Sequence, residues 1–179
     1  MNESDCATLA QHPTATIADA QDRFGVPTGI RPMWACARIA GPAFTVETRS
    51  GDNLFVHRAL AAAPPGSAIV VNGFGDTSRA LIGDLIVTTA IAKQLAGFVI
   101  DGAIRDIESL ASMGMPIFAK GVSPAGPYKT GPGRLGVPVA IGGVVVVPNT
   151  DTADVLRRTE ALIANEHTKR IANKQAAAN

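Results

Sequence analysis

The sequence of 179 residues predicts a mixed α/β layered domain, and three observations lead to that class. Short apolar runs typical of buried strands alternate with helical segments along most of the chain. Hydrophobic residues make up 46% and charged residues 17% of the sequence, which is enough apolar material for one sizeable core. Strand and helix signals do not follow one regular βαβ period, so we expect a layered, mixed architecture. We interpret residues 1–179 as a single domain with loose polar ends at 1–13 and 168–179.

The first half of the chain is punctuated by capping residues, glycines and prolines. Thr14 or Thr16 is a suitable helix cap, and Asp52 or Asn53 is another. The elements predicted here are a helix to Phe24, strands at 37–39 and 43–48 around a Gly41–Pro42 turn, a helix from 54 to the Pro64–Pro65–Gly66 break, and a strand at 68–71.

The second half begins with a segment that is too apolar to have one face in water. The predicted elements are a helix at 84–95, a strand at 98–100, a turn at Asp101–Gly102, a helix at 107–113 and a strand at 117–119. Residues 121–143 are rich in glycine and proline and predict a long irregular connection with at most one strand. A strand at 144–147 and a terminal helix capped within 149–151 complete the chain.

The helix at 84–95 and the strand after it bring charged residues together. A helix of about twelve residues rises about 18 Å, and about five strand residues return about 16 Å. Asp84 and the Arg105–Asp106 pair are therefore expected to meet at the same edge of the sheet. Two carboxylates, one guanidinium and a helix N-terminus would share one mouth.

Composition argues against several classes of function. The formal charge is +1, no basic run is present and aromatic residues make up only 4%, so nucleic-acid binding has no support. Cys6 and Cys36 have neither metal-ligand spacing nor the density of a disulfide scaffold. The sequence has no cationic apolar leader and no apolar run of 18 residues, so we expect a cytoplasmic protein without membrane contact.

The expected mouth suits a small anion and a divalent metal ion. The first amides of a helix lack partners and attract anions, and Leu85 and Ile86 have no polar side chain to block them. Arg105 is expected opposite as a second carboxylate anchor. Asp84 and Asp106 offer the oxygen ligands that Mg²⁺ uses together with water. The alternative is structural: each acid caps a helix, and Arg105 pairs with Glu108 or with an acid at an interface.

The sequence resembles the 4-hydroxy-4-methyl-2-oxoglutarate aldolase / RraA-like family. The resemblance depends on Gly83-Asp84-Leu85-Ile86 followed, after an interval, by Arg105-Asp106. Further matching stretches are Thr16-Ile17-Ala18-Asp19-Ala20, Gly41-Pro42-Ala43, Gly51-Asp52-Asn53 and Lys120-Gly121-Val122-Ser123-Pro124.

This resemblance implies a layered β/β/α swivelling-domain fold, a homotrimer or a hexamer made of two trimers, and active sites between subunits. It implies a lyase that uses Mg²⁺, Mn²⁺ or another divalent metal to release pyruvate from 2-oxo acids by aldol cleavage or oxaloacetate decarboxylation. By position, Asp106 matches the metal ligand, Arg105 a catalytic and substrate-binding residue, Asp84 the catalytic acid beside the metal waters, and Leu85 and Ile86 the amides that hold the substrate carboxylate. The alternative that the wider family implies is a non-enzymatic regulator that binds a ribonuclease or a helicase.

One departure from the family pattern lies near Val144. Family members carry an additional acidic hairpin between two strands, whereas residues 142–148 run straight through here as Gly-Gly-Val-Val-Val-Val-Pro. Weaker candidates for site residues are His57, Asn53, and the pair Lys129 and Arg134, either of which is a possible partner for a distal substrate carboxylate.

Overall fold

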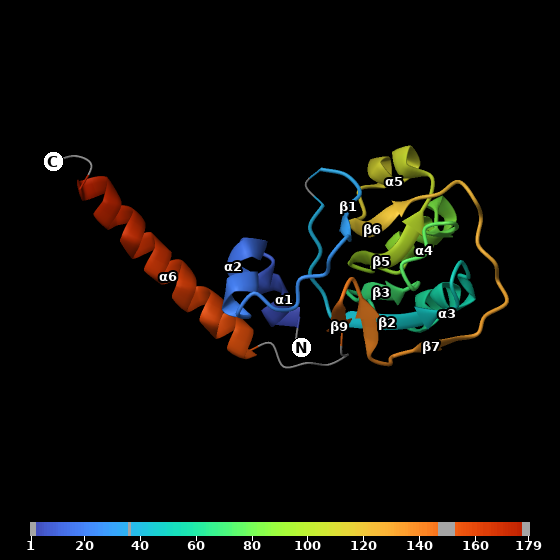
Figure 1. The fold of residues 1–179 in the computed structure, drawn as a ribbon, viewed down its shortest axis with the longest axis horizontal. Coiled ribbons are helices and arrows are strands. Elements are labelled where there is room, and N and C mark those ends of the chain that lie inside the picture. Colours follow the sequence, from blue (N-terminus) through green and yellow to red (C-terminus); the bar gives the residue numbers. More distant parts are fainter. Residues whose placement is uncertain (1–2, 36, 147–152, 177–179) are drawn as a thin grey trace. The chain divides into compact units, whose positions relative to one another are not determined.

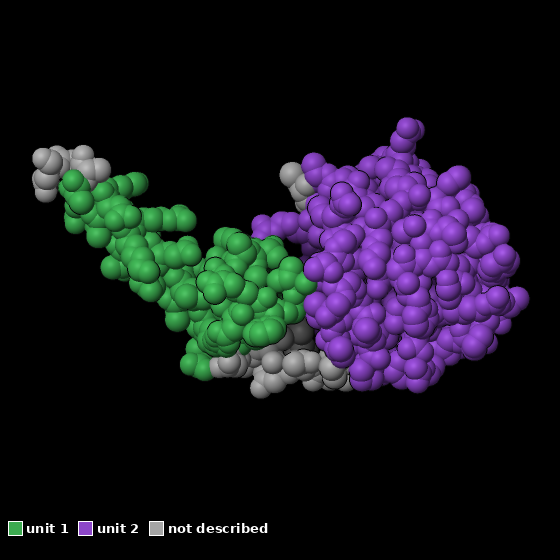
Figure 2. All heavy atoms as spheres, viewed as in Figure 1, with its two compact units in different colours: residues 1–26, 151–179 green, residues 27–150 purple. Residues whose placement is uncertain are grey.

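The structure is a computed structural model that describes residues 3–35, 37–146 and 153–176. Contacts between its parts divide the chain into two compact units, which Figure 2 colours separately. One unit combines residues 1–26 with 151–179, and the other comprises residues 27–150.

The first unit is helical. It contains α1 (Glu3–Leu9), α2 (Thr14–Ala20) and the long α6 (Ala153–Ala176). Helix α2 packs against α6, where Arg158 binds Asp22 at 2.7 Å. Residues 3–9 and 168–176, which were expected to be loose ends, are helical in the structure. The expected cap at 149–151 lies outside the described residues.

The second unit is built on a seven-stranded sheet in the order β1-β6-β5-β3-β2-β7, with β4 beside β5 (Figure 1). Strands β2, β3, β4, β5 and β6 are parallel to their neighbours in this group, and the edge strands β1 and β7 are antiparallel. The bounds are β1 Arg31–Pro32, β2 Ala43–Thr48, β3 Ala68–Asn72, β4 Ala80–Ile82, β5 Gly97–Ile104, β6 Ile117–Val122 and β7 Gly133–Leu135.

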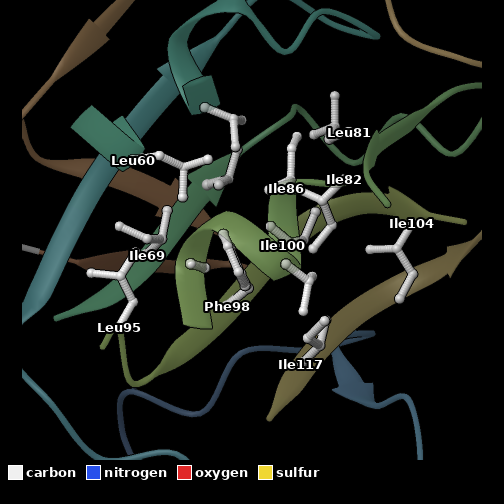
Figure 3. Packing of buried hydrophobic residues seen from close by; sticks show 14 of the residues in the cluster. Leu60, Ile69, Leu81, Ile82, Ile86, Leu95, Phe98, Ile100, Ile104 and Ile117 are labelled. Atoms are coloured by element: carbon white, nitrogen blue, oxygen red, sulfur yellow. The ribbon is translucent and has the colours of Figure 1, made fainter. Parts of the chain in front are cut away.

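Different layers cover the two faces of this sheet. Helices α3 (Leu54–Ala62), α4 (Asp84–Ala92) and α5 (Ile107–Met113) pack on one face, over Ile69, Phe98 and Ile100 (Figure 3). A hairpin of β8 (Val139–Ile141) and β9 (Val144–Val146) covers the other face and packs on Val70. Because successive strand residues point to opposite faces, β3 is buried on both sides. The unit therefore has β/β/α layers, as expected.

Four details of the expected secondary structure are wrong. Residues 37–39 form no strand, and β4 was not expected. The predicted turn at Asp101–Gly102 lies inside β5, because Lys120 pairs with the buried Asp101 carboxylate at 2.7 Å and parallel neighbours continue the ladder. Residues 121–143 contain β7 and β8 instead of at most one strand.

The remaining expected elements form close to their predicted places, although α2 and α4 are shorter than expected. The predicted last strand ends at Val146 among the described residues, and Val147 lies outside them. A turn at Gly142–Gly143 joins β8 and β9, and both glycines have positive φ, which only glycine adopts at little cost. Among the described residues, none of the helices is both long enough and apolar enough to span a bilayer.

Candidate active site

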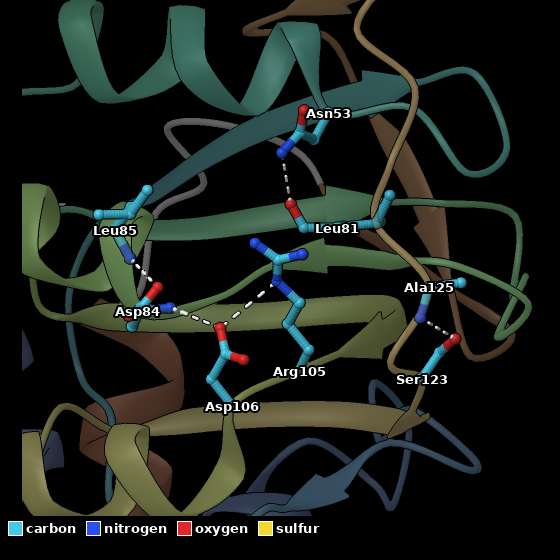
Figure 4. A network of polar contacts seen from close by, with 8 residues as sticks. All are labelled: Asn53, Leu81, Asp84, Leu85, Arg105, Asp106, Ser123 and Ala125. Atoms are coloured by element: carbon cyan, nitrogen blue, oxygen red, sulfur yellow. Dashed lines mark hydrogen bonds and ion pairs between the residues drawn. The ribbon is translucent and has the colours of Figure 1, made fainter.

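Asp84, Arg105 and Asp106 meet at one mouth, as the sequence predicted (Figure 4). The Asp84 amide donates a hydrogen bond to Asp106 Oδ2 at 3.2 Å. Arg105 Nε lies 3.3 Å from the same oxygen. The side chains of Arg105 and Asp106 are 38% and 36% exposed, so both are accessible from solvent.

Two parallel strands bring these residues together. Strand β4 lies beside the end of β5, where Ile82 is paired with Ile104. Strand β4 is followed by α4, and β5 is followed by α5. Where the two strands end, the Arg105 amide donates a hydrogen bond to the Ile82 carbonyl at 3.1 Å. Because the carboxyl ends of parallel strands meet at one sheet edge, residues 22 positions apart become neighbours.

Gly83 makes this close approach possible. A Cβ atom at this position would lie 2.5 Å from Asp106 Oδ2 and 2.9 Å from Arg105 Nε. Real Cβ atoms do not come that close to a neighbouring heavy atom, so any larger residue would displace the Asp106 carboxylate or the Arg105 side chain. Gly83 is therefore part of the site through its missing side chain.

Two of the backbone amides at the start of α4 donate hydrogen bonds to acidic side chains. The hydrogen-bond ladder of the helix begins with Val87, whose amide donates to the Gly83 carbonyl. Of the three amides before it, that of Asp84 donates to Asp106, and that of Leu85 donates to Asp84 Oδ1 at 2.7 Å. The expectation that both the Leu85 and Ile86 amides are open is thus wrong for Leu85. For the Ile86 amide, the described part of the chain offers no side-chain acceptor.

The structural alternative, in which the Asp106 side chain caps the helix that starts at Ile107, is not what the structure shows. Asp106 occupies the N-cap position of α5, but its side chain makes no capping hydrogen bond there. Its carboxylate instead faces α4 and Arg105. Its backbone has φ 60° and ψ 37°, a left-handed conformation that is uncommon outside glycine and recurs at functional sites. Asp84 is the first residue of α4 and follows the N-cap Gly83, so its bond to Leu85 retains a local structural role.

A small pocket opens beside this mouth. It has a volume of about 60 Å³, which is room for about four to six water-sized groups. Arg105, Leu85, Ile86 and residues 80–83 line it, together with Asn53, His57, Pro127 and Lys129. This lining contains two permanent cations and no carboxylate among the described residues, so the pocket favours an anion.

The two acids fit a metal ion that keeps most of its water. No cluster of three or more acidic, histidine or cysteine ligands occurs in the described ranges. Mg²⁺ needs only one or two carboxylates together with waters, and each acid has one oxygen outside the contacts given above. The donor set is therefore compatible with Mg²⁺ or another hard divalent cation.

The weaker candidates from the sequence separate into two groups. His57 and Lys129 line the pocket, and burial lowers the pKa of His57, as does the nearby Lys129 ammonium. Arg134 does not line it and instead pairs with Glu47 at 2.6 Å. Asn53 also lines the pocket, and its amide nitrogen donates to the Leu81 carbonyl.

The sequence indicated only a helix-capping role for Asp52, but the structure shows a further one. It is completely buried, and its carboxylate accepts hydrogen bonds from the amides of Leu54, Thr130 and Gly131 and from the Thr130 hydroxyl. Burial alone would raise the pKa of Asp52, but these hydrogen bonds hold it below its ordinary value. Since Thr130 lies 78 positions away, no local signal in the sequence indicates the contact.

Fold and site together define a class: a β/β/α-layered protein with an acid–arginine mouth where two parallel strands end. The sequence profile of the RraA-like family, described as Aldolase/RraA, matches residues 14–151. The chain belongs to the RraA-like family, as its motifs indicated.

Three relatives illustrate this membership. A Halalkalibacterium halodurans protein named "Putative 4-hydroxy-4-methyl-2-oxoglutarate aldolase" is 42% identical over 137 residues, or 76% of this chain. The chain spans 65% of the length of that relative. An uncharacterized Pseudomonas syringae protein of known structure is 26% identical with a TM-score of 0.84, covering 100% of this chain and 91% of its own. The RNA-processing inhibitor RraA from Thermus thermophilus is 30% identical with a TM-score of 0.69, over 76% of this chain and 83% of its own.

Proposed function

We propose that this protein is a divalent-metal-dependent lyase that cleaves 2-oxo acids of the 4-hydroxy-4-methyl-2-oxoglutarate type to pyruvate. In the same site it decarboxylates oxaloacetate. The observation that carries the proposal is the convergence of Asp84, Arg105 and Asp106 at the N-terminus of α4, beside a pocket lined by cations. The name of the relative that is 42% identical supports the same chemistry.

The acids and the arginine divide the work. Asp106, with Asp84 through water, would hold Mg²⁺, Mn²⁺ or another divalent ion. Such an ion supplies Lewis acidity toward the keto oxygen of the substrate. Arg105 binds the substrate carboxylate in a planar, two-pronged way and stabilises the negative charge that develops as the carbon–carbon bond breaks.

The start of α4 provides the second anchor for the substrate carboxylate. The Ile86 amide is available to it directly, whereas the Leu85 amide becomes available only when the Asp84 carboxylate turns away. That movement would also free Asp84 to act as an acid or a base. Through an intervening water, Asp84 accepts the proton of the C4 hydroxyl when the C3–C4 bond breaks, and a proton returned to C3 completes pyruvate.

Both reactions pass through the same pyruvate enolate, so one site serves for both. The test is pyruvate formation from oxaloacetate and from 4-hydroxy-4-methyl-2-oxoglutarate, with Mg²⁺ and with EDTA. We expect turnover of both substrates that EDTA abolishes and added Mg²⁺ restores. Absence of metal-dependent turnover of either substrate would overturn the proposal.

We also propose that the active form is a homotrimer or a pair of trimers. Leu85 and Ile91 on α4 are 75% and 44% exposed, which leaves apolar surface of this helix uncovered within the chain. Light scattering coupled to size exclusion measures the assembly directly, and a monomer that is active at nanomolar concentration would contradict it.

A regulator that binds a ribonuclease or a helicase is the competing function. The relative from Thermus thermophilus, named as an RNA-processing inhibitor, favours it. Arg105 and Asp106 argue against it, because a binding surface has no need of a metal ligand beside an arginine. The formal charge of +1 argues against direct contact with RNA. Recovery of a ribonuclease in a pull-down, together with absent lyase activity, would reverse the ranking.

A further inference from the structure

A register shift in β5 lies directly before the residues of the mouth. Ile100 of β5 pairs with Ala119 of β6. Three residues later in β5, Ala103 pairs with Gly121, which is only two residues later in β6. Shifts of this kind, called β-bulges, are rare between parallel strands and recur beside active sites. The extra residue places the end of β5, and with it Arg105, about 3.3 Å further back along the sheet than a regular ladder would.

An ion pair joins the two strands where the register shifts. Asp101 and Gly102 are the extra length of β5, and Lys120 is the residue between the two paired positions of β6. Lys120 Nζ lies 2.7 Å from Asp101 Oδ1, and the Asp101 side chain is only 8% exposed. A buried carboxylate is costly without a compensating charge, so the lysine stabilises the register in which the two side chains meet.

Further hydrogen bonds of Asp101 fix the shifted segment to the surrounding chain. Its Oδ2 accepts from the Gly142 amide at 3.2 Å, at the turn between β8 and β9. Its carbonyl accepts from the amides of Gly73 and Gly75 at 3.2 and 3.1 Å, in the loop after β3. A Cβ atom at Gly75 would lie 2.8 Å from Lys120 Nζ, so this loop passes beside the ion pair. Asp101 therefore connects β5 and β6 with the β8–β9 turn and with the loop after β3.

Gly102 carries the effect of the shift to β4. A Cβ atom at Gly102 would lie 3.1 Å from Leu81 Cδ1 and 3.2 Å from the Asp76 carbonyl oxygen, so β4 and the loop before it pack closely on this segment. Ile82 of β4 then pairs with the end of β5, and Asp84 follows two residues later. The shifted segment thus sets the position of β4 as well as that of β5, and the mouth in Figure 4 is built from the ends of these two strands.

The ion pair itself lies outside the pocket beside the mouth. Neither Asp101 nor Lys120 lines that pocket. Both line a separate hollow beside the β8–β9 turn, together with Gly142 and Gly143. An influence of the pair on cleavage within this chain therefore passes through β5 and not through contact with substrate.

We propose that the Asp101–Lys120 ion pair positions the active site by holding β5 one residue out of register with β6. The register in turn sets how closely Asp106 and Arg105 approach Asp84. This inference rests on the proposed lyase function and adds two positioning residues to it. The geometry demands such a device, because a misplacement of about 1 Å in an active site can cost about 100-fold in rate.

Lys120→Met tests the pair, because it removes the charge and keeps most of the length of the side chain. We expect kcat/KM for oxaloacetate with Mg²⁺ to fall about 10- to 100-fold, measured well below the melting temperature. Lys120→Arg keeps the charge and should retain most of the activity. Val46→Ala is the stability control, since Val46 is completely buried in β2, which β3 separates from β5. It should lower the melting temperature and leave kcat/KM unchanged.

A double-mutant cycle with Asp101→Asn tests whether the two residues act through one contact. The combined variant should lose no more activity than the more damaging single change, because both remove the same interaction. Should Lys120→Met fail to fold, Asp101→Asn keeps an acceptor oxygen for the lysine and is expected to lower kcat/KM in the same direction. Losses that multiply in the combined variant would contradict a shared role.

Hydrogen exchange followed by NMR gives a readout that does not need activity. The amides of Asp84 and Arg105 donate hydrogen bonds across the mouth, so their protection from exchange reports its geometry. Both amides should exchange faster in Lys120→Met than in Val46→Ala, compared under conditions of equal overall stability. Equal protection in the two variants would overturn the inference.

The failure of this inference and the failure of the lyase function look different. A wild-type protein without metal-dependent turnover removes the lyase function, and the exchange comparison alone then decides whether the ion pair positions the mouth. A wild-type protein with turnover, whose Lys120→Met variant loses no more kcat/KM than Val46→Ala, leaves the lyase and overturns the inference.

Discussion

Two regions at the pocket, the mouth of Asp84, Arg105 and Asp106 (the inner end) and the wall of Pro127 and Lys129 (the outer end), are built in different ways. At the inner end, Asp84, Arg105 and Asp106 come from two strand–helix junctions only 22 positions apart. At the outer end, Asp52 holds a segment 78 positions away. The inner end is exposed and carries the groups suited to chemistry, whereas the anchor of the outer end is completely buried. Within one pocket, the groups suited to chemistry are exposed and come from segments close in the sequence. The supporting carboxylate is buried and joins segments far apart in the sequence.

The same contrast separates the expected effects of substitution. Changes at the inner end should slow cleavage of every substrate, because all share the same bond-breaking step. Changes at the outer end should mainly alter the stability of the fold. The predictions below test this division.

The largest expected effect is that of Asp106→Ala. Losing the metal ligand should reduce kcat by on the order of 10⁴-fold, since the charge stabilisation by a metal is worth several kcal/mol. Added Mg²⁺ should restore little. Steady-state kinetics across a Mg²⁺ titration measure this, with Glu108→Ala on the adjacent helix as the matched acidic control. Full activity in Asp106→Asn would mean that the acid is only structural.

Asp84→Asn should slow proton transfer while leaving metal and substrate binding intact. Losing one acid–base group costs about 10²–10⁴-fold in kcat. Asn keeps an acceptor for the Leu85 amide, so the start of α4 is expected to remain folded. Steady-state kinetics and thermal melts separate proton transfer from helix capping. A kcat and a melting temperature equal to those of the wild type would show that Asp84 has no part in proton transfer.

Arg105→Lys should fail nearly as badly as Arg105→Ala, with a loss of about 10²–10³-fold in kcat/KM. Lysine keeps the positive charge but lacks the planar fork that binds a carboxylate with two hydrogen bonds. The two variants are compared on oxaloacetate, the smallest substrate. A lysine variant close to wild type would show that charge alone is sufficient.

Gly83→Ala tests the close approach at the inner end. The new Cβ must displace the Asp106 carboxylate or the Arg105 side chain, and a misplacement of about 1 Å in an active site can cost about 100-fold in rate. The φ of Gly83 is −150°, which alanine adopts readily, so the effect is steric. We expect a loss of about 10- to 100-fold in kcat/KM with little change in melting temperature. Equal activity would show that the three groups tolerate a wider spacing.

The smallest effect on chemistry is expected for Asp52→Asn, whose main consequence is for stability. The lowered pKa means that the ionised form of Asp52 stabilises the fold above the unfolded pKa of about 3.9. This contribution disappears as the pH falls through the folded pKa. The variant should therefore lose about 1–3 kcal/mol at pH 7, and progressively less below pH 4. Urea unfolding of both proteins between pH 7 and pH 3 measures it, and a pH-independent difference would contradict the linkage.

Much of the fold follows from local pattern. The apolar run of β3 predicts a buried strand, which the structure confirms. The expectation that the helix from 84 is too apolar to have a face in water is wrong within this chain, because Leu85 and Ile91 of α4 are exposed. The mouth of Asp84, Arg105 and Asp106 was predicted from local geometry too, because a helix from 84 and the strand after it return the chain to one edge of the sheet. Rise per residue and helix punctuation suffice for that argument.

Tertiary structure decided the features in which distant segments satisfy one another. Asp101 reads as a turn residue, yet it lies inside β5 because Lys120 of the neighbouring strand pairs with it. Residues 125–131 read as irregular loop, yet three donors from this region find the buried carboxylate of Asp52. The sequence by itself determined the layered α/β class and the residues of the inner mouth, because both depend on periodicity and short-range geometry. Only the tertiary structure determined that residues 130 and 131 bind Asp52, because a buried carboxylate needs hydrogen-bond donors and these donors lie 78 and 79 positions away along the chain.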